Sequence, residues 1–563
     1  MFLPTTKDEL KKLGWDGLDV ILVTGDTYID SPFIGVAVIG KVLLNAGYRV
    51  GIIAQPDWQS DRDITRLGEP RLFWGVTAGC VDSMVANYTP VKMPRRQDDY
   101  TPGGRNIKRP DRASIVYTNL IRRFFKNTRP IVLGGIEASL RRVPHYDYWD
   151  DAIRRSILFD AKADYLVYGM GEKTVLELAQ KLKKGEPTDK IRSLCYISGS
   201  PRPGYLHLSS AAEVKADQQK FINMFHLFYQ NNDPRTAKGL CQLQDTRYLI
   251  HNPPAPYPDE AELSAVYDLD YERDVHPLYK RNGPVKALET IRFSLTGHFG
   301  CFGECNFCGI SVHQGRAIRS RNEASILKEA KTLTRLPDFQ GYILDVGGPT
   351  ANMYGMECEN QQKLGSCRSK SCLYPQVCRN RKISHARQVR LLKKLGEIPG
   401  VKKVFVASGI RPDLVLADEI AGTAYLREVV ENHVSGQLKL APEHSEDQVL
   451  NLMRKPGTKP LEDFKNLFDR LNREAGKKQF LTYYLIAAHP GCEKADMIKL
   501  KEFFTRKLKM NPEQVQIFTP LPSTYSALMY YTGVDPWTGQ PVFVEKDPKR
   551  KEEQKKIIIS NSR

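Results

Sequence analysis

The stretch Ile291-Arg-Phe-Ser-Leu-Thr-Gly-His-Phe-Gly-Cys301-Phe-Gly-Glu-Cys305-Asn-Phe-Cys308 decides how the rest of the chain is interpreted. An apolar, strand-like run leads into a glycine-rich loop in which three cysteines are spaced C-x3-C-x2-C. The interleaved glycines allow positive φ angles and close approach of the backbone, so the loop can wrap around a compact soft-metal centre. Zinc is the main alternative, but it needs four ligands in paired spacings, and only His298 and His313 are nearby.

The same residues carry a family resemblance. Cys301-x3-Cys305-x2-Cys308, with Phe307 directly before the last cysteine, resembles the signature of the radical S-adenosylmethionine (SAM) superfamily. The resemblance implies a [4Fe-4S] cluster held by three thiolates, with one iron left open to chelate SAM. It also implies electron transfer to the sulfonium, formation of a 5′-deoxyadenosyl radical and hydrogen abstraction from a substrate. Zinc or buried free thiols are the alternatives.

Length and composition limit the class of protein. The chain has 563 residues, 41% of them hydrophobic, which predicts two or three domains. The sequence lacks an apolar stretch long enough to span a bilayer, and Met1-Phe-Leu-Pro-Thr-Thr-Lys lacks the pattern of a signal peptide, so we expect a cytoplasmic protein without a membrane partner. Seven of the eleven cysteines lie between Cys301 and Cys378, and such clustering indicates metal or redox chemistry.

Residues 1–195 are predicted to form a doubly wound α/β domain. Buried-type strands, such as Asp19–Thr24 and Arg49–Ala54, alternate with helices. With Gly134-Gly135-Ile-Glu-Ala-Ser and Gly169-Met-Gly171-Glu172 in glycine-containing loops, the domain resembles the cobalamin-binding-like domain that precedes many radical SAM barrels. Asp26-Thr-Tyr-Ile-Asp-Ser lacks the histidine of the axial-ligand motif, which argues against cobalamin.

Two further segments were assigned from composition. Residues 196–285 are polar and rich in proline, and we interpret them as a bridging insert. The basic loop from Lys92 to Arg112 is longer than a plain connection, so we expect it to be exposed and to dock a substrate or partner, with ordinary solvated surface as the alternative. The net charge of +18 permits RNA binding without requiring it.

Residues 286–530 are predicted to form a partial (β/α)6 radical SAM barrel, followed by a basic C-terminal tail, 531–563. After the run at Ile291, strand-like segments recur at a spacing that suits a parallel series: Gly341–Val346, Lys403–Ser408, Gly436–Leu440, Gln479–Ile486 and Gln514–Phe518. Active sites of βα barrels lie at the C-terminal ends of the strands. The substrate of an open, six-stranded barrel can be large.

Polar residues and glycines gather at these strand ends, where they resemble the SAM-binding edges of the superfamily. The resemblance implies that SAM contacts are made by Phe307, Gly347, Gly348, Ser408, Arg411 and Lys439. Pro349 stands where the superfamily often has glutamate, so the contact there would use backbone carbonyls. Residues 438–456 resemble the methylthiotransferase-like branch.

A second cysteine set lies in a polar insert, 355–380. Cys358, Cys367, Cys372 and Cys378 could bind a second iron–sulfur cluster or a structural zinc, or could be inert thiols, and the uneven spacings leave this open.

Across nearly its whole length the chain resembles the YgiQ family of radical SAM proteins, which implies architecture and cofactors but not a substrate. The leading hypothesis is a radical SAM enzyme served by a reductant such as flavodoxin or ferredoxin, acting on an unknown substrate, for which RNA and protein are candidates. The alternatives are a cobalamin-assisted radical methyltransferase, methylthiotransferase-like modification of RNA or protein, and an RNA-binding protein with a structural cluster.

Overall fold

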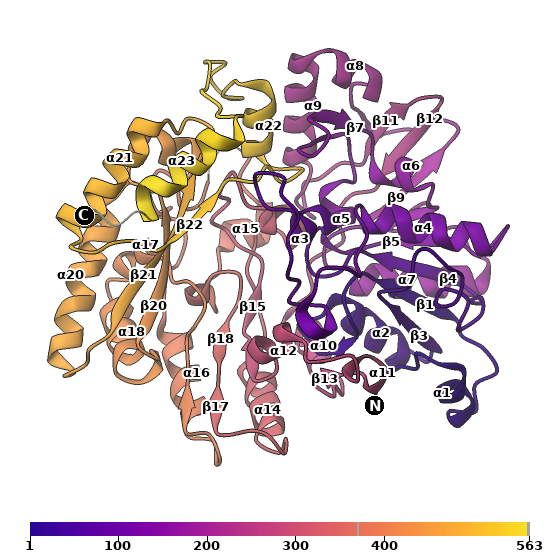
Figure 1. Cartoon of the computed structure of the whole chain (residues 1–563), viewed down its shortest axis with the longest axis horizontal. Helices are drawn as coiled ribbons and strands as arrows, with labels where there is room; N and C mark the ends of the chain where they lie inside the picture. Colours follow the sequence, from indigo (N-terminus) through magenta and orange to yellow (C-terminus); the bar gives the residue numbers. More distant parts are fainter. Residues whose placement is uncertain (369–370, 560–563) are drawn as a thin grey trace. The chain divides into compact units, whose positions relative to one another are not determined.

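The computed structural model describes residues 1–368 and 371–559 (Figure 1). Contacts divide the chain into two units. The first comprises Met1–Tyr257 and Ala265–Arg292, and the second comprises Pro258–Ser264 and Phe293–Arg563. The boundary before Phe293 lies inside the run that opens the cysteine loop.

The first unit is built on a sheet with the strand order β10-β11-β12-β9-β8-β5-β4-β1-β3. Its parallel half contains β1 (Val20–Thr24), β3 (Val50–Ala54), β4 (Phe73–Thr77), β5 (Ile131–Leu133) and β8 (Tyr165–Val167). In chain order these strands are arranged 2-1-3-4-5, a doubly wound order in which the winding reverses between β1 and β4. Ligands of such sheets bind at this switch point, outside the carboxyl ends of the strands.

Local sequence explains these elements. Every residue of β1 and β3 is buried, as expected for parallel strands covered on both faces. Helix α2 (Gly35–Asn45) buries an apolar face, and the chain leaves it through Gly47, whose φ of 85° suits glycine. Further helices connect the later strands: α3 (Ser83–Asn87), α4 (Ala113–Phe124), α5 (Gly135–Leu140), α6 (Ile157–Ala161) and α7 (Glu172–Lys184).

The structure differs from the expected bridging insert at 196–285. Most of this segment belongs to the first unit, where it extends the sheet through β9 (Leu194–Ser198), β10 (Leu206–His207), β11 (Leu240–Gln244) and β12 (Arg247–His251). Helices α8 (Ala211–Ala216) and α9 (Gln218–Gln230) accompany these strands. The physical reason is that β8 would otherwise be an edge with unpaired backbone groups; β9 pairs with β8, and the β11–β12 hairpin in turn pairs with β9.

The second unit contains a parallel strand series. The strands are β14 (Ser294–Thr296), β17 (Tyr342–Ile343), β18 (Asp345–Gly347), β19 (Lys403–Val404), β20 (Gln437–Glu443), β21 (Phe480–Ala487) and β22 (Gln514–Ile517). β14 pairs with β18, β17 with β19, β20 with β21 and β21 with β22, all in parallel. A parallel bridge between Ile410 and Leu440 joins the segment that continues β19, which is the third strand position of the series, to β20, the fourth. Neighbours in space therefore follow the order of the chain.

Helices accompany this series and supply its core. They include α14 (Glu323–Leu333), α16 (Ala386–Gly396), α17 (Pro412–Ala417), α18 (Gly422–Glu428), α19 (Asp447–Met453), α20 (Lys459–Glu474) and α21 (Lys494–Glu502). Leu295, Ile343 and Leu438 from the strands pack in one cluster with Leu391 and Phe464 from the helices. The first strand begins at Ser294, later than the expected Ile291, because Lys286–Ile291 forms helix α12.

The expected basic tail, 531–563, is folded over most of its described length. It follows α22 (Tyr525–Thr532) and contains α23 (Pro548–Ile559), which contacts α21 and β22 (yellow in Figure 1). Lys551 and Gln554 are buried: the Lys551 ammonium donates to the Tyr530 hydroxyl at 2.7 Å, and the Gln554 side chain accepts from the Ala488 amide at 2.9 Å.

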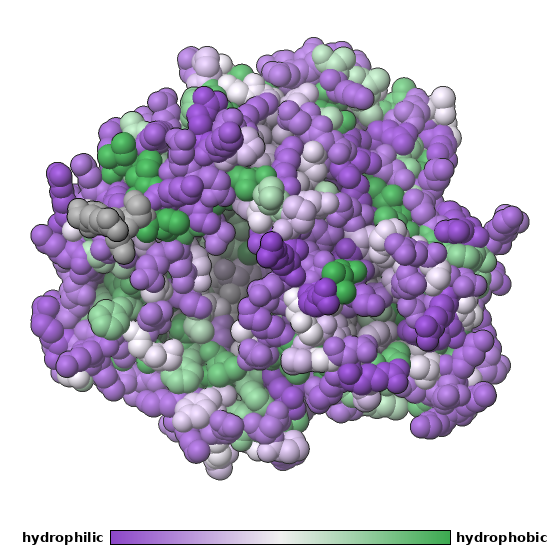
Figure 2. All heavy atoms as spheres, viewed as in Figure 1, coloured by the Kyte–Doolittle hydropathy of each residue, from purple (hydrophilic) through white to green (hydrophobic). Residues whose placement is uncertain are grey.

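The surface gives no sign of a membrane segment. Each helix in the described ranges is too short or too polar to cross a bilayer. The face drawn in Figure 2 is mainly hydrophilic, and its apolar residues lie in scattered patches.

Candidate functional site

The cysteine loop follows β14 and is held close to its neighbours by backbone contacts. The Gly297 amide donates to the Gly347 carbonyl at 2.7 Å, and β15 (His298–Phe299) pairs with β16 (Arg319–Ser320). Gly300 has a φ of 78°, and a Cβ there would lie 2.1 Å from the Ala317 carbonyl oxygen. Only glycine fits this turn, so the backbone can bend directly before the first cysteine.

The three predicted thiols are gathered around one loop. The Gly303 amide donates to Sγ of Cys301 at 3.4 Å, and a Cβ on Gly303 would lie 3.3 Å from Sγ of Cys301 and 3.9 Å from Sγ of Cys305. Burial, reinforced by the charge of Cys305, raises the pKa of Cys308 to about 12 and also raises the pKa of Cys301. A bound metal would have to displace these protons, since thiolates are the ligands.

The three thiols are not drawn together as a single-ion site. Within the described residues, no group of three or more His, Cys, Asp or Glu side chains is close enough to hold one ion. A cluster accepts wider ligand spacing, because each thiolate attaches to a different iron. The donor set of three thiolates fits a cluster better than it fits a structural zinc.

A buried arginine faces the loop from the end of the third strand position. Arg411 donates through Nε to Asp413 Oδ1 at 3.0 Å and through Nη2 to Asp413 Oδ2 at 2.6 Å, while Nη1 lies 4.0 Å from Sγ of Cys305. Burial opposes its charge, but Asp413 and the neighbouring thiols outweigh burial and raise the pKa of Arg411. A fixed positive charge therefore lies beside the Cys305 thiol.

Sequence reasoning missed the residues that hold Arg411 in place. Asn352 accepts from the Arg411 amide at 2.9 Å and donates to the Arg411 carbonyl at 3.0 Å. Its amide nitrogen also lies 3.2 Å from Nε2 of His385, whose Nδ1 is 2.8 Å from Asp418. Asn352 and His385 come from the connection between β18 and β19, and Asp418 from the one between β19 and β20, and none stands in a recognisable short motif.

The structure places most predicted SAM contacts near the loop. Gly347 ends β18 and Gly348 follows it, and a Cβ on Gly348 would lie 2.5 Å from Cε1 of His298, three residues before Cys301. Ser408 is bound to Asp345, which accepts hydrogen bonds from the Ser408 hydroxyl and amide and so orients the end of the third strand position.

The other two predicted contacts are Phe307, within the loop itself, and Lys439, on a later strand. Phe307 packs against the core cluster with its ring 6.3 Å from that of His489, so its side chain is partly structural. Lys439 lies on β20, and its carbonyl accepts from the Ile410 amide at 3.0 Å. Glu443, at the end of β20, is buried with a φ of 70°, and its charge reaches Cys308. A non-glycine residue in this conformation is strained, as is common at functional sites.

The second cysteine set lies in the insert around α15 (Glu359–Leu364). The Cys378 amide donates to the Cys372 carbonyl at 2.8 Å, and Sγ of Cys358 lies 3.9 Å from the Asn380 carbonyl. The Cys367 carbonyl accepts from Arg316 at 2.8 Å. The insert is therefore tied to the second unit close to the cysteine loop.

The switch point of the first unit is filled by side chains. Arg109 donates to Asp26 at 2.5 Å and lies 3.3 Å from Asp98, and all three are buried. The Gly25 amide donates to the Thr77 carbonyl, and a Cβ on Gly25 would lie 2.2 Å from the Ala78 carbonyl oxygen. The loops after β1 and β4 are thus in direct contact where a ligand would enter.

This result corrects the interpretation of the basic loop. Lys92, Arg95, Arg96 and Lys108 are exposed, as expected for a docking loop, but Arg109 is only 5% exposed and forms part of the core. The reason is that the buried carboxylates of Asp26 and Asp98 require a positive partner, and Arg109 of the basic loop supplies it.

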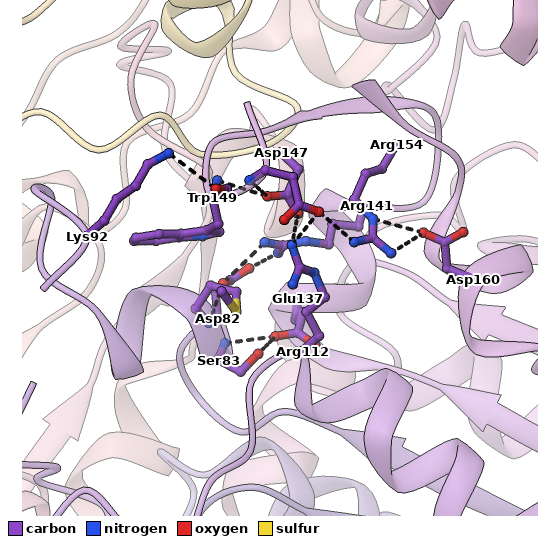
Figure 3. Close-up of polar contacts among 12 residues, drawn as sticks. Asp82, Ser83, Lys92, Arg112, Glu137, Arg141, Asp147, Trp149, Arg154 and Asp160 are labelled. Carbon is purple, nitrogen blue, oxygen red and sulfur yellow. Dashed lines mark hydrogen bonds and ion pairs between the residues drawn. The ribbon is translucent and has the colours of Figure 1, made fainter. Parts of the chain in front are cut away.

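A second group of charges fills the carboxyl ends of β4 and β5 (Figure 3). Its ion pairs are Arg141 with Asp82, Arg112 with Asp147, and Arg154 with Asp160. Glu137 accepts from the Ser83 amide at 2.8 Å in the same group. The cavity that this group encloses has a volume of about 10 Å³, which suffices for one water molecule.

Comparison with known proteins supports these observations. Residues 2–294, more than half of the chain, match the family described as Radical SAM N-terminal. Over 558 residues the chain is 57% identical to UPF0313 protein FN0734 of Fusobacterium nucleatum, covering 99% of this chain and 98% of the relative. The chain belongs to the UPF0313 family. A UPF0313 protein of Thermotoga petrophila is 50% identical over 562 residues, with coverage of 99% and 98%.

Solved structures with a similar fold are cobalamin-dependent radical SAM enzymes. The radical SAM methyltransferase TsrM of Kitasatospora setae, with cobalamin and a [4Fe-4S] cluster bound, aligns over 91% of this chain and 74% of its own, with a TM-score of 0.52 and 16% identity. The cobalamin-dependent enzyme OxsB aligns over 95% and 58%, with a TM-score of 0.50 and 12% identity. At these identities the comparison shows the fold of the UPF0313 chain alone.

Cobalamin does not fit the switch point of the UPF0313 chain. The ion pair between Arg109 and Asp26 occupies the position that a ligand of the sheet would need. The residues after β1, where an axial-ligand motif would lie, are buried and include no histidine. The first unit therefore keeps the doubly wound fold with its ligand edge closed by protein.

Proposed function

We propose that this UPF0313 protein is a radical SAM enzyme in which Cys301, Cys305 and Cys308 hold a [4Fe-4S] cluster beside a SAM site. The observation that carries the proposal is the convergence of Cys301 and Cys305 around Gly303, with Cys308 close enough to feel the charge of both and the guanidinium of Arg411 beside Cys305. The Radical SAM N-terminal match and the fold add support. When bound, cluster and SAM would supply the 5′-deoxyadenosyl radical that removes hydrogen from a substrate.

The chain's own residues would bind and orient these groups. Gly347 and Gly348 allow SAM to approach the backbone at the end of β18, where a side chain would collide with Ser408 or His298. Because Pro349 has no carboxylate, carbonyl oxygens of this turn would accept from the SAM amino group. Ser408, Arg411 and Lys439 lie at the next two strand positions, where they could contact the remaining polar groups of SAM.

The strand series of the second unit would then be a partial (β/α)6 barrel, with the cofactors at its carboxyl end. The parallel pairing in chain order supports this assignment. A series of this length leaves one side open, which suits a large substrate such as RNA or a protein. A one-electron donor, such as flavodoxin or ferredoxin, would be needed to reduce the cluster.

Anaerobic reconstitution with iron, sulfide and SAM tests the proposal. Dithionite-reduced protein should produce 5′-deoxyadenosine, and Cys305→Ala should abolish it because a thiolate ligand has no substitute in the loop. Cys195→Ala, which changes a buried thiol of the first unit, is the matched control and should keep full activity. Production of 5′-deoxyadenosine by the Cys305→Ala protein would refute the ligand assignment.

A further inference from the structure

The insert that carries the second cysteine set encloses a buried arginine. Arg381 is 5% exposed, and its Nη2 lies 3.4 Å from Sγ of Cys372 and 3.0 Å from the side-chain oxygen of Gln361. Its guanidinium carbon stacks 3.7 Å from the centre of the Phe302 ring. Arg381 therefore lies between the second cysteine set and the loop of the first.

The charge of Arg381 is not balanced by a carboxylate. In residues 1–368 and 371–559, Arg381 forms no ion pair, and its Nε and Nη1 have no hydrogen-bond partner although both atoms are buried. An uncompensated buried charge costs several kcal/mol, so proteins pair such groups. Arg411 in the first site shows the usual solution, since Asp413 neutralises it. The charge of Glu304 reaches Cys372, but Glu304 pairs with Arg316 and not with Arg381.

The four thiols of the insert are the groups able to supply that anion. Contacts close the insert around Arg381: the Cys378 amide binds the Cys372 carbonyl, Sγ of Cys358 approaches Asn380, and Arg316 holds the Cys367 carbonyl. Neutral thiols would leave Arg381 unpaired. Four thiolates on a [4Fe-4S]²⁺ core carry a net charge of minus two, which would compensate it.

The neighbourhood of the insert also points to a centre next to the first one. A small apolar cluster contains Phe302, Met353, Met356 and Leu373, and both Cys301 and Cys372 pack against it. The insert is otherwise polar and lacks a core that would order it, so metal ligation would supply the missing stabilisation. Four thiolates carry a net charge of minus two with zinc as well as with a [4Fe-4S]²⁺ core, so the packing of Cys301 and Cys372 against one apolar cluster is the observation that favours an iron–sulfur centre here.

We propose that Cys358, Cys367, Cys372 and Cys378 ligate a second iron–sulfur cluster, whose negative charge Arg381 balances. The proposal goes beyond the proposed function, because it assigns a separate centre with its own ligands. It does not depend on SAM cleavage, and the two assignments can fail independently.

Metal analysis of anaerobically reconstituted full-length protein tests the assignment. A variant with Cys301, Cys305 and Cys308 all changed to alanine should keep roughly half of the parent's iron and sulfide, since two clusters of equal size would be reduced to one. Adding Cys367→Ala and Cys372→Ala should remove the remainder. Cys195→Ala with Cys241→Ala, a pair of thiols in the first unit, is the control and should change nothing.

The outcomes are distinguishable. If the triple variant loses all its iron while its circular dichroism is unchanged, the second cluster does not exist. The assignment of Cys301, Cys305 and Cys308 to the first cluster would still stand. Zinc without sulfide in the triple variant would overturn it in favour of a structural zinc. Iron equal to that of the parent would instead refute the first ligand set.

A second experiment keeps all four ligands of the second cluster. In the triple-variant background, Arg381→Gln should shift the reduction potential of the remaining cluster to more negative values, and Arg381→Lys should shift it less. An unchanged potential in Arg381→Gln would refute the charge-balancing role.

Discussion

Nη1 of Arg411 lies 4.0 Å from Sγ of Cys305, while the other two nitrogens of the same guanidinium are held by Asp413. One face of the side chain is fixed by an acid and the opposite edge is directed at a sulfur ligand. Because Asn352 anchors the Arg411 backbone on both sides, the guanidinium cannot withdraw easily.

This relationship predicts a change in redox potential. In Arg411→Gln the proposed first cluster should become harder to reduce, by on the order of 100 mV, because a positive charge beside Cys305 is lost in a buried site. Arg411→Lys should keep most of the effect. An EPR-monitored redox titration measures the potential, and equal potentials in the parent and Arg411→Gln would contradict the electrostatic role.

Gly348→Ala should weaken SAM binding. A Cβ at this position would lie 2.5 Å from Cε1 of His298, so the turn or the imidazole must move. Overpacking of this kind costs about 1–3 kcal/mol, which corresponds to roughly a tenfold to hundredfold loss of affinity. Calorimetric titration of SAM into the reconstituted protein gives the affinity. Gly396→Ala, in open space at the end of α16, should bind as the parent does.

Arg109→Ala should destabilise the first unit. Removing the guanidinium leaves Asp26 and Asp98 buried without their partner, at a cost of about 3–5 kcal/mol. Urea unfolding followed by fluorescence should show an earlier transition. Lys108→Ala, its exposed neighbour, should stay within about 0.5 kcal/mol of the parent. Similar midpoints for the two variants would mean that the pair contributes little.

Glu9 predicts a pH-dependent contribution to stability. Its carboxylate accepts from the Thr5 and Thr6 amides and pairs with His276. Burial opposes ionisation, but these partners outweigh it and lower the pKa of Glu9 from 4.5 to about 2. The unfolded chain therefore takes up the proton first, so the contribution is present above about pH 4.5 and is lost as the pH falls towards 2.

The comparison of the parent with Glu9→Gln measures this contribution. Allowing for partial exposure, the parent should be more stable by about 1 kcal/mol at pH 7, and the difference should shrink at pH 3. Asp61→Asn, which changes an exposed carboxylate, should show no such trend. A difference that persists unchanged at low pH would show that packing, not charge, carries the effect.

The cysteine loop could be predicted from sequence because its information is local. Ligand spacing, the glycines and the strand before Cys301 all lie within one short stretch. The strand series was also recognisable, since each apolar run is followed by glycine or polar residues at the strand end. These features require no knowledge of distant partners.

The residues that hold the sites in place could not be predicted in this way. Arg109 is separated from Asp26 by 83 positions, and Arg411 from Asn352 by 59. Within a basic loop, the sequence does not distinguish a buried arginine from an exposed one. The burial of Arg109 therefore could not be predicted. The segment 196–285 was misplaced for a similar reason: strand pairing with β8 and β9 depends on contacts that composition does not encode.

The position of helix α23 affects the order in which the two units can fold during synthesis. Gln554 accepts from the Ala488 amide and donates to the Cys492 carbonyl, so α23, which also contacts the edge strand β22, completes the hydrogen bonding of the turn after β21, which is synthesised earlier. During translation the second unit must wait with this edge uncovered until α23 has left the ribosome. Its apolar surface is then accessible to chaperones, while the first unit, whose strands all precede it, is free to fold.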